Sequence, residues 1–275
     1  MIQMIKTKQG KLDLKKKTAI MGILNITPDS FSDGGQYNQV EYAVAQAEKM
    51  VADGADIIDI GGESTRPGYT PVSIAEEIDR VVPVIKAIRQ SLSVPISIDT
   101  FKSETAKAAI EAGADMINDI WGAKFDPKIA EIAATYDVPI ILMHNRKQAN
   151  YSHLIEDMKN DLQESIKIAK ASGVKDDKII LDPGIGFAKT MDENIEAIRQ
   201  LASFKAMGYP LLLGVSRKRV IGHVLDLPIE ERDEGTGALT GYGITKGVDV
   251  VRVHNVELNA RIAKMTDALV GKGVD

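Results

Sequence analysis

Residues 53–59 read D-G-A-D-I-I-D, and similar phrases recur as A-G-A-D-M-I-N-D at 112–119 and K-G-V-D-V-V-R-V at 246–253. Each phrase ends a helical pattern at a glycine and then enters a short apolar run. Glycine suits this junction because the residue after a helix commonly adopts a left-handed conformation, which costs little without a Cβ atom. The repeat therefore predicts a chain of alternating helices and strands.

Short apolar runs rich in branched residues recur along the rest of the chain, with helix-length segments between them. They lack period-two alternation, as expected for parallel strands that are covered on both faces. Eight β-then-α units fit a closed (β/α)8 TIM barrel better than an open doubly wound sheet of about five or six strands. The predicted strands are residues 19–24, 57–60, 96–98, 116–117, 140–143, 179–181, 211–215 and 250–253.

Between these runs, apolar residues recur at spacings of three and four, as in amphipathic helices. Ser73 and Glu76 predict a capping box at the start of one helix. The spacing of Leu258, Ile262, Met265 and Leu269 predicts another helix.

The first 16 residues alternate around Lys8-Gln9-Gly10 and predict a β-hairpin ahead of the barrel. No linker rich in proline, glycine or serine divides the chain, and a barrel commonly takes about 250 residues. Residues 1–275 are therefore expected to form a single domain with the hairpin at 1–16.

Composition excludes several classes of protein. The 34 Lys and Arg against 39 Asp and Glu give a net charge of −5, which argues against a broad nucleic-acid surface. The chain has no cysteine, so disulfides, thiolate zinc sites and cysteine nucleophiles are excluded. No apolar run approaches the ~18 residues of a membrane span, and the N-terminus lacks the apolar core of a secretory signal. We expect a cytoplasmic protein without nucleic-acid or membrane partners.

Catalytic groups in such barrels lie at the carboxyl ends of the strands, and here a polar residue follows every predicted strand. Asp99 could merely cap the next helix, Asn118 could be a turn residue, and Asp182 could simply begin a loop. Arg252 is harder to explain in this way, because a charge inside a barrel strand is costly unless it is paired or liganded. It lies two residues from His254, so both side chains project to the same side of the strand.

The strand-end residues divide into two chemical sets. A positive set suits phosphate or pyrophosphate, and it consists of Arg66, Lys218, Arg252 and His254. An acceptor set suits a flat heterocycle with adjacent N–H donors, such as an aminopyrimidinone, and it consists of Asp99, Asn118 and Asp182. The chain lacks the glycine pattern of a dinucleotide site, so we expect an anion-bearing heterocycle as ligand and no nucleotide cofactor.

Seven ordered segments carry a family resemblance. They are G-I-L-N-I-T-P-D-S-F-S-D-G-G (22–35), D-I-G-G-E-S-T-R-P-G (59–68), I-S-I-D-T (96–100), M-I-N-D-I (116–120), D-P-G-I-G-F (182–187), S-R-K (216–218) and R-V-H-N-V (252–256). Together they closely resemble the dihydropteroate synthase family, over nearly the whole chain after the hairpin. The resemblance implies a homodimeric, Mg²⁺-assisted barrel that condenses 6-hydroxymethyl-7,8-dihydropterin pyrophosphate with 4-aminobenzoate in folate biosynthesis. Sulfonamides compete with aminobenzoate in that family.

The resemblance also implies roles for individual residues. The pterin would be held by Asp99, Asn118, Asp182 and Lys218. The pyrophosphate would be held by Asn25, Thr65, Arg66, Arg252 and His254, with Asn25 also binding the metal. The aminobenzoate would be contacted by Phe31, Ser32, Asp33, Pro67, Phe187 and Ser216. Catalysis would rest on Asn25, Lys218, Arg252 and His254.

The chemistry favours a dissociative route, because the electron-rich dihydropterin can stabilise a methylene cation as pyrophosphate leaves. The nearest rival is the pterin-binding barrel of a methyltetrahydrofolate:corrinoid methyltransferase, which shares the acceptor set but needs no pyrophosphate site. The S-T-R-P-G, S-R-K and R-V-H-N-V segments argue against it. A non-catalytic pterin-binding protein would have lost an anion-site or loop residue, and none is missing.

Overall fold

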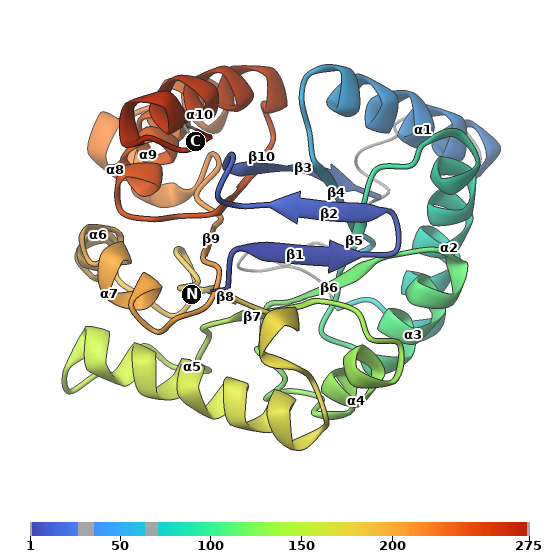
Figure 1. Ribbon diagram of the computed structural model, residues 1–275, viewed down its shortest axis with the longest axis horizontal. Coiled ribbons are helices and arrows are strands. Elements are labelled where there is room, and N and C mark those ends of the chain that lie inside the picture. The colour runs from blue at the N-terminus through green and yellow to red at the C-terminus, as the bar shows by residue number, and fades with distance from the viewer. Residues whose placement is uncertain (1, 27–35, 64–70, 274–275) are drawn as a thin grey trace.

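The computed structural model describes residues 2–26, 36–63 and 71–273 (Figure 1). Within these residues eight parallel strands form one sheet in the order β8-β7-β6-β5-β4-β3-β10-β9. A parallel bridge between Leu181 and Leu211 joins the two ends of that order, so the predicted barrel is confirmed. The strands are β3 (Ala19–Asn25), β4 (Ile57–Gly61), β5 (Ile96–Asp99), β6 (Met116–Asp119), β7 (Ile140–Met143), β8 (Ile179–Asp182), β9 (Leu212–Leu213) and β10 (Val250–Val253).

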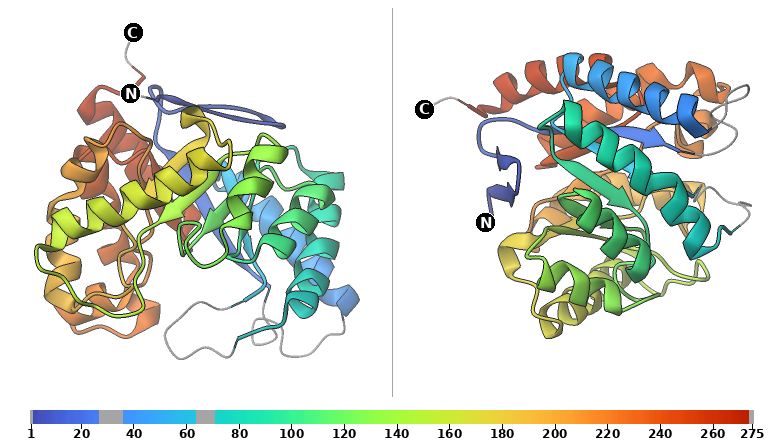
Figure 2. Two further views of the ribbon diagram at one scale, coloured as in Figure 1. Left: turned by 90° about the horizontal axis from the view of Figure 1, so that it is seen from below. Right: turned by 90° about the vertical axis from the view of Figure 1, so that its right-hand side faces the viewer.

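A ring of helices surrounds the strands (Figures 1 and 2). Branched side chains on the outer face of the barrel pack against these helices, which explains the absence of period-two alternation in the strands. The helices are α1 (Gln36–Ala52), α2 (Ile74–Ser91), α3 (Ser103–Ala112), α4 (Lys128–Thr135), α5 (Leu154–Ala171), α6 (Met191–Arg199), α7 (Leu201–Lys205), α8 (Arg219–Leu225), α9 (Asp233–Thr245) and α10 (Val256–Val270).

The predicted N-terminal hairpin is confirmed as β1 (Met4–Thr7) paired with β2 (Gly10–Asp13). It lies across one end of the barrel in Figure 2. Ile5, Leu12 and Leu14 of this segment pack on the apolar side chains that fill that end, namely Met21, Ile57, Met116, Ile141, Ile180, Leu212 and Val250. The hairpin thus plugs the amino-terminal end of the barrel, and the polar site lies at the other end.

Helix α2 begins where the sequence predicts, but its capping box is only half formed. The Ser73 hydroxyl accepts a hydrogen bond from the Glu76 backbone N–H at 3.2 Å. The Glu76 carboxylate turns away and pairs with Arg80 one turn later. A complete capping box occurs instead at the start of α6, between Thr190 and Glu193.

The helix predicted from Leu258, Ile262, Met265 and Leu269 is confirmed as α10. The side chains of Met265 and Leu269 are 60% and 74% exposed, whereas the residues that face the barrel include Asn259 and Asp267. Asp267 is buried because its carboxylate accepts from the backbone N–H and the hydroxyl of Thr18, both at 2.7 Å. The inner side of this helix therefore mixes the polar residues Asn259 and Asp267 with the apolar residues Val256 and Ala263.

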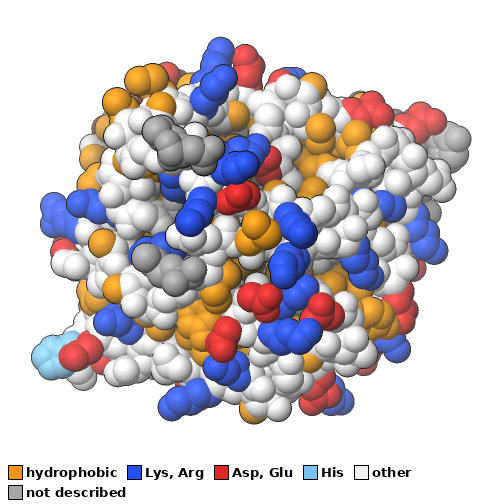
Figure 3. Space-filling model, in the orientation of Figure 1, with side chains coloured by type: hydrophobic (Ala, Val, Ile, Leu, Met, Phe, Trp, Pro, Cys, Tyr) orange, Lys and Arg blue, Asp and Glu red, His pale blue; other side chains and the backbone are white. Residues whose placement is uncertain are grey.

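The face that carries the hairpin shows basic and acidic side chains interspersed (Figure 3). Lys15, Lys16 and Lys17, which precede the barrel, are exposed. Among the helices in the described ranges, none is both long and apolar enough to cross a bilayer.

Candidate active site

Strand register places four site positions in one row at the carboxyl ends of the strands. Asn25 pairs with Gly61, Gly61 with Asp99, and Asp99 with Asn118. Gly61 has no side chain, and a Cβ atom there would lie 3.6 Å from Asn25 Oδ1 and 3.6 Å from the Asp99 Cβ. Asn25 and Asp99 therefore flank the same bare stretch of β4.

Arg252 bridges two carboxylates inside the barrel. Its Nε donates to Asp59 Oδ2 at 2.5 Å and its Nη2 donates to Asp99 Oδ2 at 2.6 Å. Burial alone would lower the pKa of Arg252, but the two carboxylates raise it above the usual value. The prediction that this charge must be paired is confirmed.

Asp59 is a site residue that sequence reasoning missed. It lies within the apolar run of β4, and its side chain is fully buried. The available signal was the same one that identified Arg252, a charged residue inside a buried strand, because such a charge requires a partner. Asp59 Oδ2 also accepts from Asn118 Nδ2 at 3.2 Å.

The acceptor set has oxygens free for a ligand. Asn118 directs its amide N–H to Asp59, which leaves its carbonyl oxygen as the acceptor that a ligand could use. Asp99 Oδ1 is buried and has no hydrogen-bond partner within the part of the chain that the structure describes. Burial raises the pKa of Asp99, and Arg252 opposes that rise. Asp99 does not cap α3, because the first N–H of that helix, at Ser103, donates to Asp126 at 2.8 Å.

Asp182 and Lys218 lie close together beside Gly214. A Cβ atom on Gly214 would lie 3.7 Å from Asp182 Oδ2 and 3.8 Å from Lys218 Nζ. The other carboxylate oxygen, Asp182 Oδ1, accepts from the Gly184 N–H at 2.7 Å. Burial raises the pKa of Asp182 and lowers that of Lys218 to about 8, while each residue's charge opposes the other's shift.

Apolar and aromatic side chains line one wall of the site. Phe187 packs against a small cluster that consists of Phe101, Ile120, Met143 and Trp121. Lys218 Nζ lies 4.9 Å from the centroid of the Phe187 ring and donates to the carbonyl of Ile185. This wall can cover the flat face of a heterocycle beside the acceptor set.

Ser216 and His254 are joined to each other. Ser216 Oγ lies 2.9 Å from His254 Nδ1 and accepts from the His254 backbone N–H at 3.1 Å. Arg252, two residues earlier, is directed to the carboxylates instead. Members of the positive and acceptor sets are therefore interleaved and contact one another.

His144, which follows strand β7, does not point into the pocket. Its ring is fully buried and directed toward α5, where Nε2 lies 2.9 Å from Asp161 Oδ2. His153 and His223 are exposed.

The remaining predicted site residues lie outside the described residues, and the structure does not test them. They are Phe31, Ser32, Asp33, Thr65, Arg66 and Pro67.

A magnesium site is compatible with the described residues only if the substrate supplies ligands. Asn25 offers a hard amide oxygen beside the bare strand at Gly61. Across the described ranges there is no group of three or more His, Cys, Asp or Glu side chains that could hold an ion. Mg²⁺ usually keeps several waters and binds through one or two side chains plus phosphate oxygens. One amide beside a pyrophosphate fits that pattern.

Three comparisons with known proteins agree. A family model described as pterin binding enzyme matches residues 21–254. The dihydropteroate synthase of Bacillus subtilis (strain 168) is 58% identical over 271 residues, covering 98% of this chain and 95% of that relative.

Solved structures agree as well. A dihydropteroate synthase from Clostridium difficile, solved in the presence of pteroic acid, is 50% identical with a TM-score of 0.92, covering 94% of this chain and 98% of that one. The Xanthomonas albilineans dihydropteroate synthase with 4-aminobenzoic acid is 37% identical with a TM-score of 0.93, covering 98% and 99%.

Proposed function

The chain belongs to the dihydropteroate synthase family, transferases of folate biosynthesis, and we propose how its own site performs that reaction. The site joins the methylene carbon of 6-hydroxymethyl-7,8-dihydropterin pyrophosphate to the amine of 4-aminobenzoate, giving 7,8-dihydropteroate and pyrophosphate. The observation that carries the proposal is the ring of acceptors at Asp99, Asn118 and Asp182 interleaved with the cations Lys218 and Arg252.

Asp182 is the principal pterin acceptor in this proposal. As a carboxylate it can accept from a ring N–H and the adjacent exocyclic amine together, the bidentate geometry that makes charged hydrogen bonds strong. The free oxygens of Asp99 and Asn118 accept further N–H groups. Phe187 and Met143 supply the apolar wall.

Arg252 keeps donors free for the leaving group. A guanidinium has five N–H donors, and Arg252 gives one to Asp59 and one to Asp99. The other N–H groups make no hydrogen bond to the described residues, so they can meet pyrophosphate oxygens. Preorganised donors aimed at growing charge are usually the largest contribution to catalysis.

In the bond-breaking step the electron pair of the carbon–oxygen bond leaves with pyrophosphate, and the dihydropterin stabilises the methylene cation. The amine nitrogen then attacks and releases its proton to solvent or pyrophosphate, so no side chain is needed as a dedicated base. When bound through Asn25 and the pyrophosphate, Mg²⁺ would neutralise charge on the leaving oxygens. Arg66, Thr65 and His254 are proposed to bind the pyrophosphate as well. Phe31, Ser32, Asp33, Pro67 and Ser216 are proposed to receive the aminobenzoate.

A pyrophosphate-release assay tests this function. The purified chain should release pyrophosphate from the dihydropterin substrate only when both 4-aminobenzoate and Mg²⁺ are present. Pterin binding without release would indicate a non-catalytic pterin-binding protein. Methyl transfer from methyltetrahydrofolate to a corrinoid, without pyrophosphate release, would instead indicate a methyltransferase.

We also propose that the chain is a cytoplasmic homodimer that pairs through the outer face of α10. Met265 and Leu269 on that face are large apolar residues exposed in the monomer, and Tyr242 of the neighbouring helix α9 is 37% exposed. Leu269→Lys should therefore yield monomers in sedimentation, whereas Met265→Leu should remain dimeric. A dimeric Leu269→Lys protein would exclude this face.

A further inference from the structure

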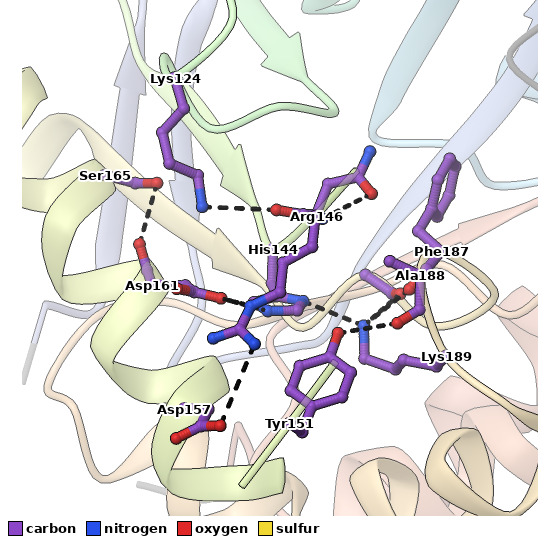
Figure 4. A network of polar contacts seen from close by, with 12 residues as sticks. Lys124, His144, Arg146, Tyr151, Asp157, Asp161, Ser165, Phe187, Ala188 and Lys189 are labelled. Atoms are coloured by element: carbon purple, nitrogen blue, oxygen red, sulfur yellow. Dashed lines mark hydrogen bonds and ion pairs between the residues drawn. The ribbon is translucent and has the colours of Figure 1, made fainter. Parts of the chain in front are cut away.

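A buried chain of polar groups lies behind the pterin-facing end of β8 (Figure 4). Lys189 Nζ lies 3.0 Å from His144 Nδ1, and His144 Nε2 lies 2.9 Å from Asp161 Oδ2. Arg146 Nε also donates to Asp161 Oδ2, at 2.5 Å. The proposed reaction uses none of these four residues.

The hydrogen-bond roles along this chain follow from the charge of His144. Burial lowers the pKa of His144 to about 4, so the ring is neutral at neutral pH. A neutral imidazole donates from one nitrogen and accepts at the other. Because Asp161 is a carboxylate that can only accept, Nε2 donates to it and Nδ1 accepts from Lys189.

Lys189 has one acceptor for each hydrogen of an ammonium group. Besides His144 Nδ1, its Nζ donates to the backbone carbonyls of Gly184 and Phe187, both at 3.0 Å. The side chain is only 9% exposed. A neutral amine has two hydrogens and a lone pair, so it would leave one of these three acceptors unpaired.

The two carbonyls belong to the loop at residues 183–188, which shapes the pterin pocket. This loop supplies the Gly184 N–H that orients Asp182 and the Ile185 carbonyl that anchors Lys218. It also carries the Phe187 ring. Its backbone is locally strained, since Ala188 has a φ of +45°, a region that L-residues rarely adopt. Contacts from outside the loop must therefore hold its conformation.

We propose that Lys189 is a positioning residue of this enzyme. Its ammonium group, oriented by His144 and Asp161, holds the 183–188 loop by hydrogen bonds in the conformation that binds the pterin. The inference rests on the proposed function for the identity of the ligand. Lys189 acts through Asp182, Phe187 and Lys218 and does not itself touch the substrate in this proposal.

The variant Lys189→Met tests these hydrogen bonds directly. Methionine keeps most of the apolar length of the side chain and removes all three N–H donors. A matched control is Lys170→Met, which removes an exposed lysine on α5 whose partner is Asp176. A second variant, Tyr151→Phe, removes the hydrogen bond that Tyr151 donates to the Ala188 carbonyl at 2.8 Å.

Amide hydrogen exchange in the 183–188 segment gives a readout that needs no activity. We expect Lys189→Met to exchange at least about tenfold faster there than the unmodified chain, with Tyr151→Phe intermediate and Lys170→Met unchanged. The melting temperature of Lys189→Met should fall modestly at pH 6, since the variant leaves three buried acceptors without a donor. Faster exchange throughout the barrel would mean a general structural role and would overturn the proposal.

Titration with 6-hydroxymethyl-7,8-dihydropterin, which lacks pyrophosphate, gives the functional readout. Lys189→Met should bind this pterin about 10- to 100-fold more weakly, and its KM for the pterin substrate should rise more than its kcat falls. If Lys189→Met unfolds, the same shift must appear in Tyr151→Phe at a smaller size. Unchanged pterin affinity in a folded Lys189→Met protein would refute the positioning role.

The pH dependence of pterin affinity distinguishes hydrogen bonding by the Lys189 ammonium group from a role in packing alone. Burial lowers the pKa of Lys189 to about 7, so its ammonium group loses a proton as the pH rises through that value. The ratio of pterin affinities between the unmodified chain and Lys189→Met should therefore be largest at pH 6 and smaller at pH 8.5. The other charged or titratable groups near Lys189 remain in both proteins, so their effects cancel in the ratio; they are His144, Asp161, Asp182, Glu193 and Lys218.

Failure of this inference can be told apart from failure of the proposed function. If the unmodified chain releases no pyrophosphate, the proposed function fails, while the exchange and binding comparisons still decide the role of Lys189. If it releases pyrophosphate and Lys189→Met matches it in binding, exchange and KM, only the positioning role fails.

Discussion

Replacing Arg252 with methionine should destabilise the fold as well as the site. The guanidinium is the shared partner of Asp59 and Asp99, whose side chains are 0% and 8% exposed. Without it, two buried carboxylates lie at the centre of the barrel with no cation joining them. Asp59 is fully buried and Asp99 is only slightly exposed, so water would solvate these charges poorly.

The magnitude follows from the two hydrogen bonds of 2.5 and 2.6 Å. A hydrogen bond to a charged group contributes about 1.5–3 kcal/mol, and removing one partner of a buried ion pair typically costs ~3–5 kcal/mol. We therefore expect a loss of about 3–5 kcal/mol in the free energy of unfolding at pH 8. Arg252→Lys keeps the charge but not the planar fork, so it should lose about half as much.

The cost should shrink in acid. Burial already raises the pKa of Asp99 with Arg252 present, and loss of the cation raises it further. Between the pKa of Asp99 in the unfolded chain and its higher pKa in the folded variant, the folded variant binds more protons than the unfolded chain. The free energy of unfolding of the variant therefore falls as the pH rises. The deficit relative to the unmodified chain should be smaller at pH 5.5 than at pH 8.

Urea unfolding at both pH values measures this, with the fluorescence of Trp121, the single tryptophan, as the signal. Pterin affinity is measured on the same samples, because Asp99 loses its fixed position with the guanidinium. If Arg252→Met loses less than about 1 kcal/mol in the free energy of unfolding at pH 8 and keeps its pterin affinity, Arg252 does not hold these carboxylates in place.

Three further predictions concern the pocket, the order of binding and the network behind the pocket. Asp182→Asn should weaken binding of a pterin lacking pyrophosphate by ~1.5–3 kcal/mol, roughly 10- to 150-fold, in a fluorescence titration without aminobenzoate; unchanged affinity would remove Asp182 from the pocket. Calorimetry should show that 4-aminobenzoate binds well only with pyrophosphate and Mg²⁺ present, and equal affinity without them would contradict a site completed by the anion. Burial alone would raise the pKa of Asp161, but hydrogen bonds from His144 and Arg146 hold it below the usual value. The ionised carboxylate therefore contributes to the free energy of unfolding above about pH 4, and this contribution is lost as the pH falls below that value. Asp161→Asn should accordingly cost about 1.5–3 kcal/mol in urea unfolding at pH 7 and distinctly less at pH 3.5, and a pH-independent deficit would argue against the ionised carboxylate.

The sequence was sufficient for the features that depend on local order along the chain. Strand runs, the glycine that ends each helix and the hairpin turn are properties of neighbouring residues, so β7 and β10 begin and end where the pattern predicts. A polar residue directly after a barrel strand must lie at the carboxyl end, which placed Asn25, Asp99 and Asp182 at the site. Strand β9 is shorter than predicted, and Leu211 before it forms only an isolated bridge to Leu181.

Only the tertiary structure decided which polar groups meet. Asp59 and Arg252 are 193 residues apart in sequence, and their pairing depends on the register of strands that come together when the barrel closes. His144 faces α5, because the alternation of side chains along β7 points Met143 inward and the next residue outward. The period of α10 identifies a helix with an apolar stripe, but the bond between Thr18 and Asp267 fixes which side meets the barrel. Local patterns specify elements, whereas the charge pairs of the site are non-local and exist only once eight strands have taken their register.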